Sequence, residues 1–231
     1  MLSLKEKQNE KCQEQEEAIT KMDILKNFNA TNLKVLRRGK PARGYFEYAK
    51  NALRNLPKDI YILFQAPADI FIADVIHTRR NSKNLKQVGS YERNSFGRYP
   101  ETPRIIATTK WQDYYINKDE FLSIIFHELG HTVASFFDGY DCYDYLSEFI
   151  EKDAIKLSIA DKKRFNYFFD EQEMWAETFA YFLGSKSIMG LSRKDFQQYF
   201  PNTITEVDSR LKTLIKEVEN LLNHLVENDN C

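Results

Sequence analysis

The sequence HELGHTV at residues 127–133 carries more information about the fold than any other part of the chain. His127 and His131 are four residues apart, so on a helix their imidazoles lie on the same face, one turn apart. At this spacing two ring nitrogens can bind one metal ion at about 2.0–2.1 Å, the distance usual for zinc. Glu128 lies one step around the helix, where its carboxylate can accept a proton from a water molecule that the metal activates. The motif therefore predicts a helix that carries one zinc ion and a general base.

The helix that carries this motif is expected to begin at Asn117 and to run toward Gly139. Asn117 and Glu120 have the spacing of a capping box, and glycine commonly ends a helix. The remaining positions are largely apolar, so the helix should lie in the core, where histidines and a carboxylate need a partner such as a metal. Gly130 costs about 1 kcal/mol relative to alanine in a helix. A close approach of another backbone would explain why it is there.

A catalytic zinc site needs a third protein ligand and an open position. The extended metzincin pattern requires a glycine at position 134 and a histidine at position 137, and the chain has Ala134 and Phe137, which excludes that class. The acidic stretch at residues 170–177, DEQEMWAE, is the expected source of the ligand. Glu173 and Glu177 share a helix face, so one can bind the metal while the other hydrogen-bonds a ligand histidine.

The rest of the chain predicts many helices and few strands, which indicates an α+β fold with a small sheet. Further helices are expected over residues 44–56, 144–157, 170–183 and 203–225, and strands over residues 59–72 and 104–109, with a long loop over residues 79–104. We expect the chain to consist of a charged helical extension at residues 1–27, one zincin-like peptidase domain at residues 28–226 and a tail at residues 227–231.

Composition narrows the classes of partner. The 33 basic and 34 acidic residues give a net charge of -1, so no global field favours nucleic acid. The N-terminus has no apolar run of the Sec type and no stretch is long enough to span a membrane, which predicts a soluble protein, cytoplasmic or exported by a non-Sec route. Cys12, Cys142 and Cys231 are odd in number and far apart, so free thiols are expected.

The motif HELGHTV and the later stretch QEMWAETFAYFL at residues 172–183 together resemble the catalytic domain of the anthrax lethal factor family of zinc metallopeptidases, which includes the secreted Pro-Pro endopeptidases. The resemblance covers about residues 115–216. It implies a zincin-like α+β fold that is mostly helical, with a small mixed sheet and an active-site helix. It also implies that His127, His131 and Glu173 bind one zinc ion, that Glu128 is the general base, and that Glu177 supports a ligand.

Two further roles are implied by analogy. The family uses a tyrosine shortly before the third ligand to stabilise the oxyanion, and Tyr167 is the candidate, although it lies six residues before Glu173 where the family usually has seven. Related zincins hold an extended substrate along an edge strand that precedes the active-site helix. That strand is expected at Arg104, Ile105, Ile106, Ala107 and Thr108.

The resemblance implies a zinc-dependent metalloendopeptidase that hydrolyses peptide bonds of a protein or peptide substrate, such as a secreted or host-directed toxin or effector. Two alternatives stay open at this point. One is an intracellular regulatory zincin that cleaves one cognate repressor. The other is a non-catalytic module that keeps zinc for structure, which would need a closed site with four protein ligands.

Overall fold

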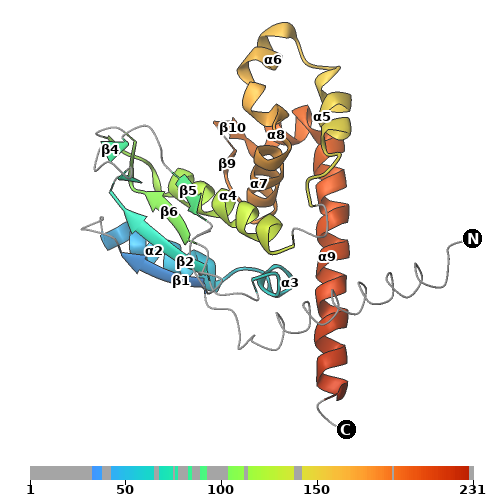
Figure 1. Cartoon of the computed structure of the whole chain (residues 1–231). Helices are drawn as coiled ribbons and strands as arrows, with labels where there is room; N and C mark the ends of the chain where they lie inside the picture. Colours follow the sequence, from blue (N-terminus) through green and yellow to red (C-terminus); the bar gives the residue numbers. More distant parts are fainter. Residues whose placement is uncertain are drawn as a thin grey trace, which may run out of the picture.

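The computed structural model describes residues 33–37, 43–64, 68–74, 76–77, 83–84, 89–92, 104–111, 114–137, 142–188 and 190–228 (Figure 1). Helices predominate in these ranges and the sheets are small, which confirms the α+β class. The extension expected at residues 1–27 and much of the loop expected at residues 79–104 lie outside the described residues.

A four-stranded sheet forms one layer, in the order β1-β2-β6-β5. Its strands are β1 (Leu33–Arg37), β2 (Ala68–Ala73), β6 (Arg104–Thr108) and β5 (Gly89–Glu92). The first three are parallel, and β5 runs antiparallel to β6, so the sheet is mixed. Alternate residues such as Ile70 and Ile105 are fully buried and join the main core, whereas Ile106 faces the other side and belongs to a small separate cluster.

Two strand predictions need correction. The strand expected over residues 59–72 begins only at Ala68, because Pro57 caps a short helix, α3 (Lys58–Tyr61), in the first part of that range. The prediction that Arg104–Thr108 forms an edge strand is wrong, because β6 is hydrogen-bonded to β2 on one side and to β5 on the other. The edge of the described sheet next to β6 is β5.

Helices make up the second layer and the C-terminal part of the chain (Figure 1). They are α2 (Arg43–Arg54), α4 (Lys118–Phe136), α5 (Ser147–Ala154), α6 (Ile159–Arg164), the 3-10 helix η2 (Asn166–Phe169), α7 (Glu171–Phe182), α8 (Arg193–Tyr199) and α9 (Pro201–Asn228). The helices predicted from the sequence are confirmed in α2, α4, α5, α7 and α9, while α3, α6, η2 and α8 were not predicted. None of the helices in the described ranges is both long and apolar enough to cross a membrane.

Three two-stranded hairpins complete the elements, and none of them was predicted from the sequence. They pair β3 (Ile76–His77) with β4 (Lys83–Asn84), β7 (Lys110–Trp111) with β8 (Tyr114–Tyr115), and β9 (Ser187–Ile188) with β10 (Leu191–Ser192). The last of these hairpins follows α7 and contacts both α4 and α7. It therefore lies beside the two helices that position the predicted zinc ligands.

The expected start of α4 is confirmed at the atomic level. The side-chain oxygen of Asn117 accepts a hydrogen bond from the backbone N–H of Glu120 at 2.8 Å, and its amide nitrogen donates to the Glu120 carboxylate at 3.1 Å. The first bond is the N-cap half of a capping box, whereas the second joins the two side chains instead of reaching the backbone N–H of Asn117. This cap fixes the first turn of α4 and hence the direction in which the later residues of that helix face.

Helices α4 and α7 pack closely because Gly130 has no side chain. A β carbon at Gly130 would lie 2.7 Å from the Cα of Ala176 and 3.1 Å from the Cβ of Phe179. The indole N–H of Trp175 donates a hydrogen bond to the carbonyl oxygen of Gly130 at 3.0 Å. The close backbone approach expected from the helix glycine is therefore confirmed, and it brings the face of α7 that carries Glu173 against α4.

Replacing Gly130 by alanine should destabilise the fold by about 1–3 kcal/mol, the usual cost of overpacking, because the β carbon meets backbone that cannot move aside. The better helix propensity of alanine offsets about 1 kcal/mol at most. Gly44→Ala in α2 is the matched control, since a β carbon there meets nothing closer than the Lys118 Nζ at 3.6 Å. Denaturant unfolding measures both variants, and a Gly130→Ala protein as stable as the parent would refute the packing argument.

Candidate metal centre

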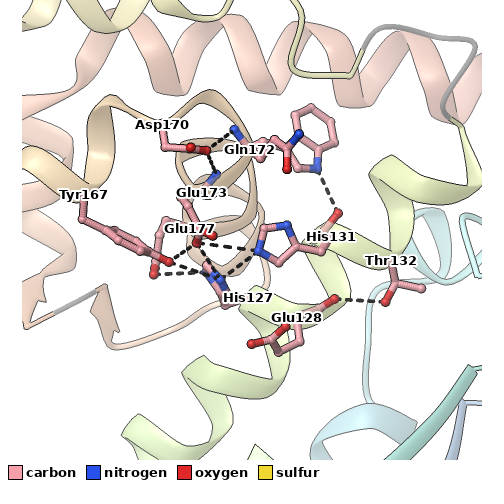
Figure 2. A network of polar contacts seen from close by, with 11 residues as sticks. His127, Glu128, His131, Thr132, Tyr167, Asp170, Gln172, Glu173 and Glu177 are labelled. Atoms are coloured by element: carbon pink, nitrogen blue, oxygen red, sulfur yellow. Dashed lines mark hydrogen bonds and ion pairs between the residues drawn. The ribbon is translucent and has the colours of Figure 1, made fainter. Parts of the chain in front are cut away.

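Three side chains from α4 and α7 converge on one point (Figure 2). The Nε2 atoms of His127 and His131 lie 3.1 Å apart. Oε2 of Glu173 lies 3.2 Å from Nε2 of His127 and 3.7 Å from Nε2 of His131. Among the described residues, these three side chains form the one group of histidine, cysteine and carboxylate ligands that could hold a metal ion. The ligand set expected from the sequence is therefore brought together.

The separations within this group fit zinc. Zinc bonds of about 2.0–2.1 Å at tetrahedral angles put neighbouring ligand atoms about 3.3–3.4 Å apart. The three separations of 3.1, 3.2 and 3.7 Å lie around that value. Two imidazoles and one carboxylate are also the donor set of known catalytic zinc sites, which leave a fourth position open. The residues present therefore fit a zinc ion.

Glu177 supports the site from the other side of an imidazole. Its Oε1 lies 3.1 Å from Nδ1 of His127, the ring nitrogen that faces away from the ligand group. The distance suits an ion pair, although its geometry falls short of a hydrogen bond, so Nδ1 is a buried atom without a hydrogen-bond partner. Glu177 is 4 % exposed. A buried carboxylate here favours a proton on Nδ1, which leaves Nε2 free to bind a metal.

The carboxylates set the protonation of the ligands. Burial lowers the pKa of His127, but the charge of Glu177 and the close approach of the Glu173 and Glu177 carboxylates outweigh it and raise this pKa to about 10. Burial raises the pKa of Glu173, but hydrogen bonds with His127, His131 and Tyr167 outweigh it and hold this pKa well below its usual range. In the metal-free protein His127 is therefore protonated. Its positive charge then lies beside two carboxylates, where a bound cation would supply the positive charge instead.

Zinc affinity should rise by about tenfold per pH unit between pH 7 and pH 9, because binding must displace the His127 proton at any pH below its raised pKa. Competition with a chromophoric chelator measures the dissociation constant at each pH. Glu177→Gln removes the charge that raises the pKa of His127. In this variant the increase of zinc affinity with pH should therefore level off at a lower pH than in the parent. A parent protein whose affinity is flat above pH 7 would contradict the shift.

The carboxylate of Glu128 is not part of the ligand group; it lies next to Gly89 of β5 and close enough to His127 and His131 for their charges to act on it. Its side chain is 7 % exposed, and β5 and β6 both contact α4. Burial raises the pKa of Glu128, and the nearby charges of His127 and His131 counteract part of that rise. A buried carboxylate with a raised pKa, next to the ligands but not among them, has the properties of a general base.

Tyr167 reaches the site from η2. Its hydroxyl donates a hydrogen bond to Oε2 of Glu173 and lies 3.4 Å from Nε2 of His127. Burial and the hydrogen bond with Glu173 raise its pKa, so the hydroxyl keeps its proton. The structure thus brings Tyr167 to the ligands despite the six-residue spacing, because a 3-10 helix and the cap of α7 connect it to Glu173.

Asp170 fixes the start of α7, and with it the position of Glu173. Its side chain accepts hydrogen bonds from the backbone N–H groups of Gln172 at 3.0 Å and Glu173 at 3.1 Å. The sequence signal was visible, since aspartate is a preferred N-cap residue. Gly89 of β5 was not predicted as a site residue, because it lies in the range expected to be a loop.

No protein-family model matches this chain, and the comparison with curated proteins gave no match.

Proposed function

We propose that this chain is a zinc-dependent metalloendopeptidase that hydrolyses peptide bonds of a protein substrate. The observation that carries the proposal is the ligand group itself, in which Nε2 of His127, Nε2 of His131 and Oε2 of Glu173 have the mutual separations of a tetrahedral zinc site. When bound there, zinc would supply Lewis-acid activation of a water molecule and of the scissile carbonyl group.

Glu128 is the proposed general base. Its carboxylate accepts a proton from the attacking water and later returns it to the amine that leaves. Its burial keeps bulk water away from the transferred proton. Its raised pKa makes the carboxylate a stronger base, which favours acceptance of the proton from water. Glu128 is one residue from His127 but is not part of the ligand group, so it is free for proton transfer.

Tyr167 is the proposed oxyanion donor. Its hydroxyl lies beside the ligands and keeps its proton, so it can donate a hydrogen bond to an oxygen that gains negative charge in the transition state. Its present acceptor, Glu173, is the residue proposed to bind zinc. Engagement of that carboxylate with a cation would release the hydroxyl for the substrate.

An extended substrate would add to β5 rather than to β6. A peptide can join a sheet only at an edge, where main-chain hydrogen bonds hold it. In the described sheet β6 has a strand on both sides, whereas β5 is the last strand and contacts α4, the helix with the metal ligands. The substrate role expected for Arg104–Thr108 therefore passes to Gly89–Glu92 in this proposal.

The number of ligands in the group favours a catalytic zinc site over a structural one. A structural site is closed by four protein ligands. Within the described ranges, the group of histidine and carboxylate ligands has three members. A site with three protein ligands keeps the position that catalysis requires.

A peptide library incubated with the zinc-loaded protein should give products cleaved at internal bonds. A metal chelator should stop cleavage, and added zinc should restore it, because the three ligands bind the ion reversibly. Mass spectrometry of the products also reports the bond that is preferred. A zinc-loaded protein that cleaves no peptide, or cleavage that is indifferent to the chelator, would overturn the proposal.

A further inference from the structure

Gly89, the first residue of β5, lies against the general base. A β carbon added to Gly89 would overlap Oε1 of Glu128, would come within 3.1 Å of the carboxylate carbon, and would lie 2.8 Å from Cγ2 of Ile124. Gly89 pairs with Ala107 of β6. Residues that are paired directly across two strands face the same side of the sheet, and Ala107 is fully buried in the core cluster that includes α4. Gly89 and Ala107, both small residues, therefore face α4.

The backbone of Gly89 does not require a glycine. Among the glycines of the described residues, positive φ angles occur at Gly184 and Gly190 and not at Gly89. A residue with a side chain could therefore adopt this backbone without conformational strain. A side chain at position 89 is excluded by lack of space, because the carboxylate of Glu128 occupies the place where its β carbon would lie.

We infer that Gly89 is a positioning residue for Glu128: the missing side chain leaves the room in which the carboxylate lies between β5 and the metal ligands. This inference rests on the proposed function, because it assigns Glu128 the role of general base. The carboxylate is the free end of a flexible side chain, so an added methyl group displaces it more easily than it displaces the strand. A larger residue at position 89 therefore moves the base while the fold and the zinc ligands stay in place.

The first test compares Gly89→Ala with Gly44→Ala, a glycine with room for a β carbon and no contact with the site. Gly89→Ala should lower kcat/KM by about tenfold to 100-fold, mainly through kcat, since a displacement of about 1 Å can cost that much. Zinc affinity should stay close to that of the parent, because Glu128 is not in the ligand group. Gly44→Ala should retain parental activity. Parental activity in Gly89→Ala would overturn the inference.

A double-mutant cycle separates positioning from packing. In a Glu128→Asp background the shorter side chain no longer fills the space, so adding Gly89→Ala should cause little further loss of activity. In an Ile124→Ala background the contact with Glu128 remains, so the full loss should persist. Equal losses in both backgrounds would show that Gly89 acts through packing alone, which overturns the inference.

Binding of acetohydroxamate to the zinc-loaded protein gives a readout that needs no turnover. The hydroxamate chelates zinc and donates a hydrogen bond to the general base, so Gly89→Ala should weaken it about tenfold, while Gly44→Ala should not. Calorimetry measures both constants. If hydroxamate binding weakens but the parent cleaves no peptide, the positioning inference stands and the proposed function fails. If cleavage occurs and Gly89→Ala changes neither readout, the inference fails alone.

Discussion

Replacing Glu128 by glutamine is expected to abolish peptide cleavage and to leave zinc bound. Glutamine has nearly the same shape as glutamate, so it should fit the buried position where Glu128 is 7 % exposed. It cannot accept and return a proton, and the loss should reach at least about 10²–10⁴-fold, the usual contribution of general acid–base catalysis. Since Glu128 is not in the ligand group, zinc affinity should be close to that of the parent.

A matched substitution and a metal assay make this result specific. Glu151→Gln changes an exposed glutamate on α5, far along the chain from the ligands, and should retain full activity. Zinc content of both variants is measured after dialysis. Cleavage by Glu128→Gln within about tenfold of the parent would remove Glu128 as the base. Loss of zinc from that variant would instead show that the carboxylate helps to hold the ion.

Replacing Glu173 by alanine is expected to strip zinc from the site, whereas Glu177→Ala should only weaken its binding. Oε2 of Glu173 lies within 3.7 Å of both ligand nitrogens, so its removal takes away one of three protein ligands. Glu177 contacts Nδ1 of His127, on the far side of the ring. Loss of such a supporting carboxylate usually costs about 10–100-fold in metal affinity. The loss in Glu173→Ala should exceed that range.

Gln172→Ala is the control for this comparison, because Gln172 is exposed in the same turn of α7 and is not a ligand. Competition with a chelator of known affinity gives the three dissociation constants. If Glu177→Ala lost more affinity than Glu173→Ala, the ligand and its supporting carboxylate would have to exchange roles. Equal and small losses would mean that neither carboxylate binds the metal.

The parts of the fold that local patterns determine could be predicted from the sequence. The start of α4 follows from Asn117, whose side chain caps the backbone N–H of Glu120, and the start of α7 follows from Asp170. Helical spacing on these two helices predicted which histidines and carboxylates could form the group of His127, His131 and Glu173 that could hold a metal ion. Gly130 predicted a close approach without naming its partner, and the structure identifies that partner as Ala176.

The parts that depend on distant contacts could not be predicted. The five residues of β1 carry no strong signal of their own, and they form a strand because β2 pairs with them. The order of strands in the sheet is likewise set by long-range pairing, so β6 was mistaken for an edge. Gly89 has no motif around it, and its position against Glu128 arises only when β5 packs on α4.

X-ray absorption at the zinc edge of the zinc-loaded protein tests the central claim most directly. The account predicts one zinc ion per chain, with two imidazole ligands and oxygen ligands at about 2.0–2.1 Å. The nitrogen signal should fall when His127 or His131 is replaced by alanine. A protein that retains no zinc, or a sulfur ligand at about 2.3 Å from a thiolate such as that of the buried Cys142, would contradict it.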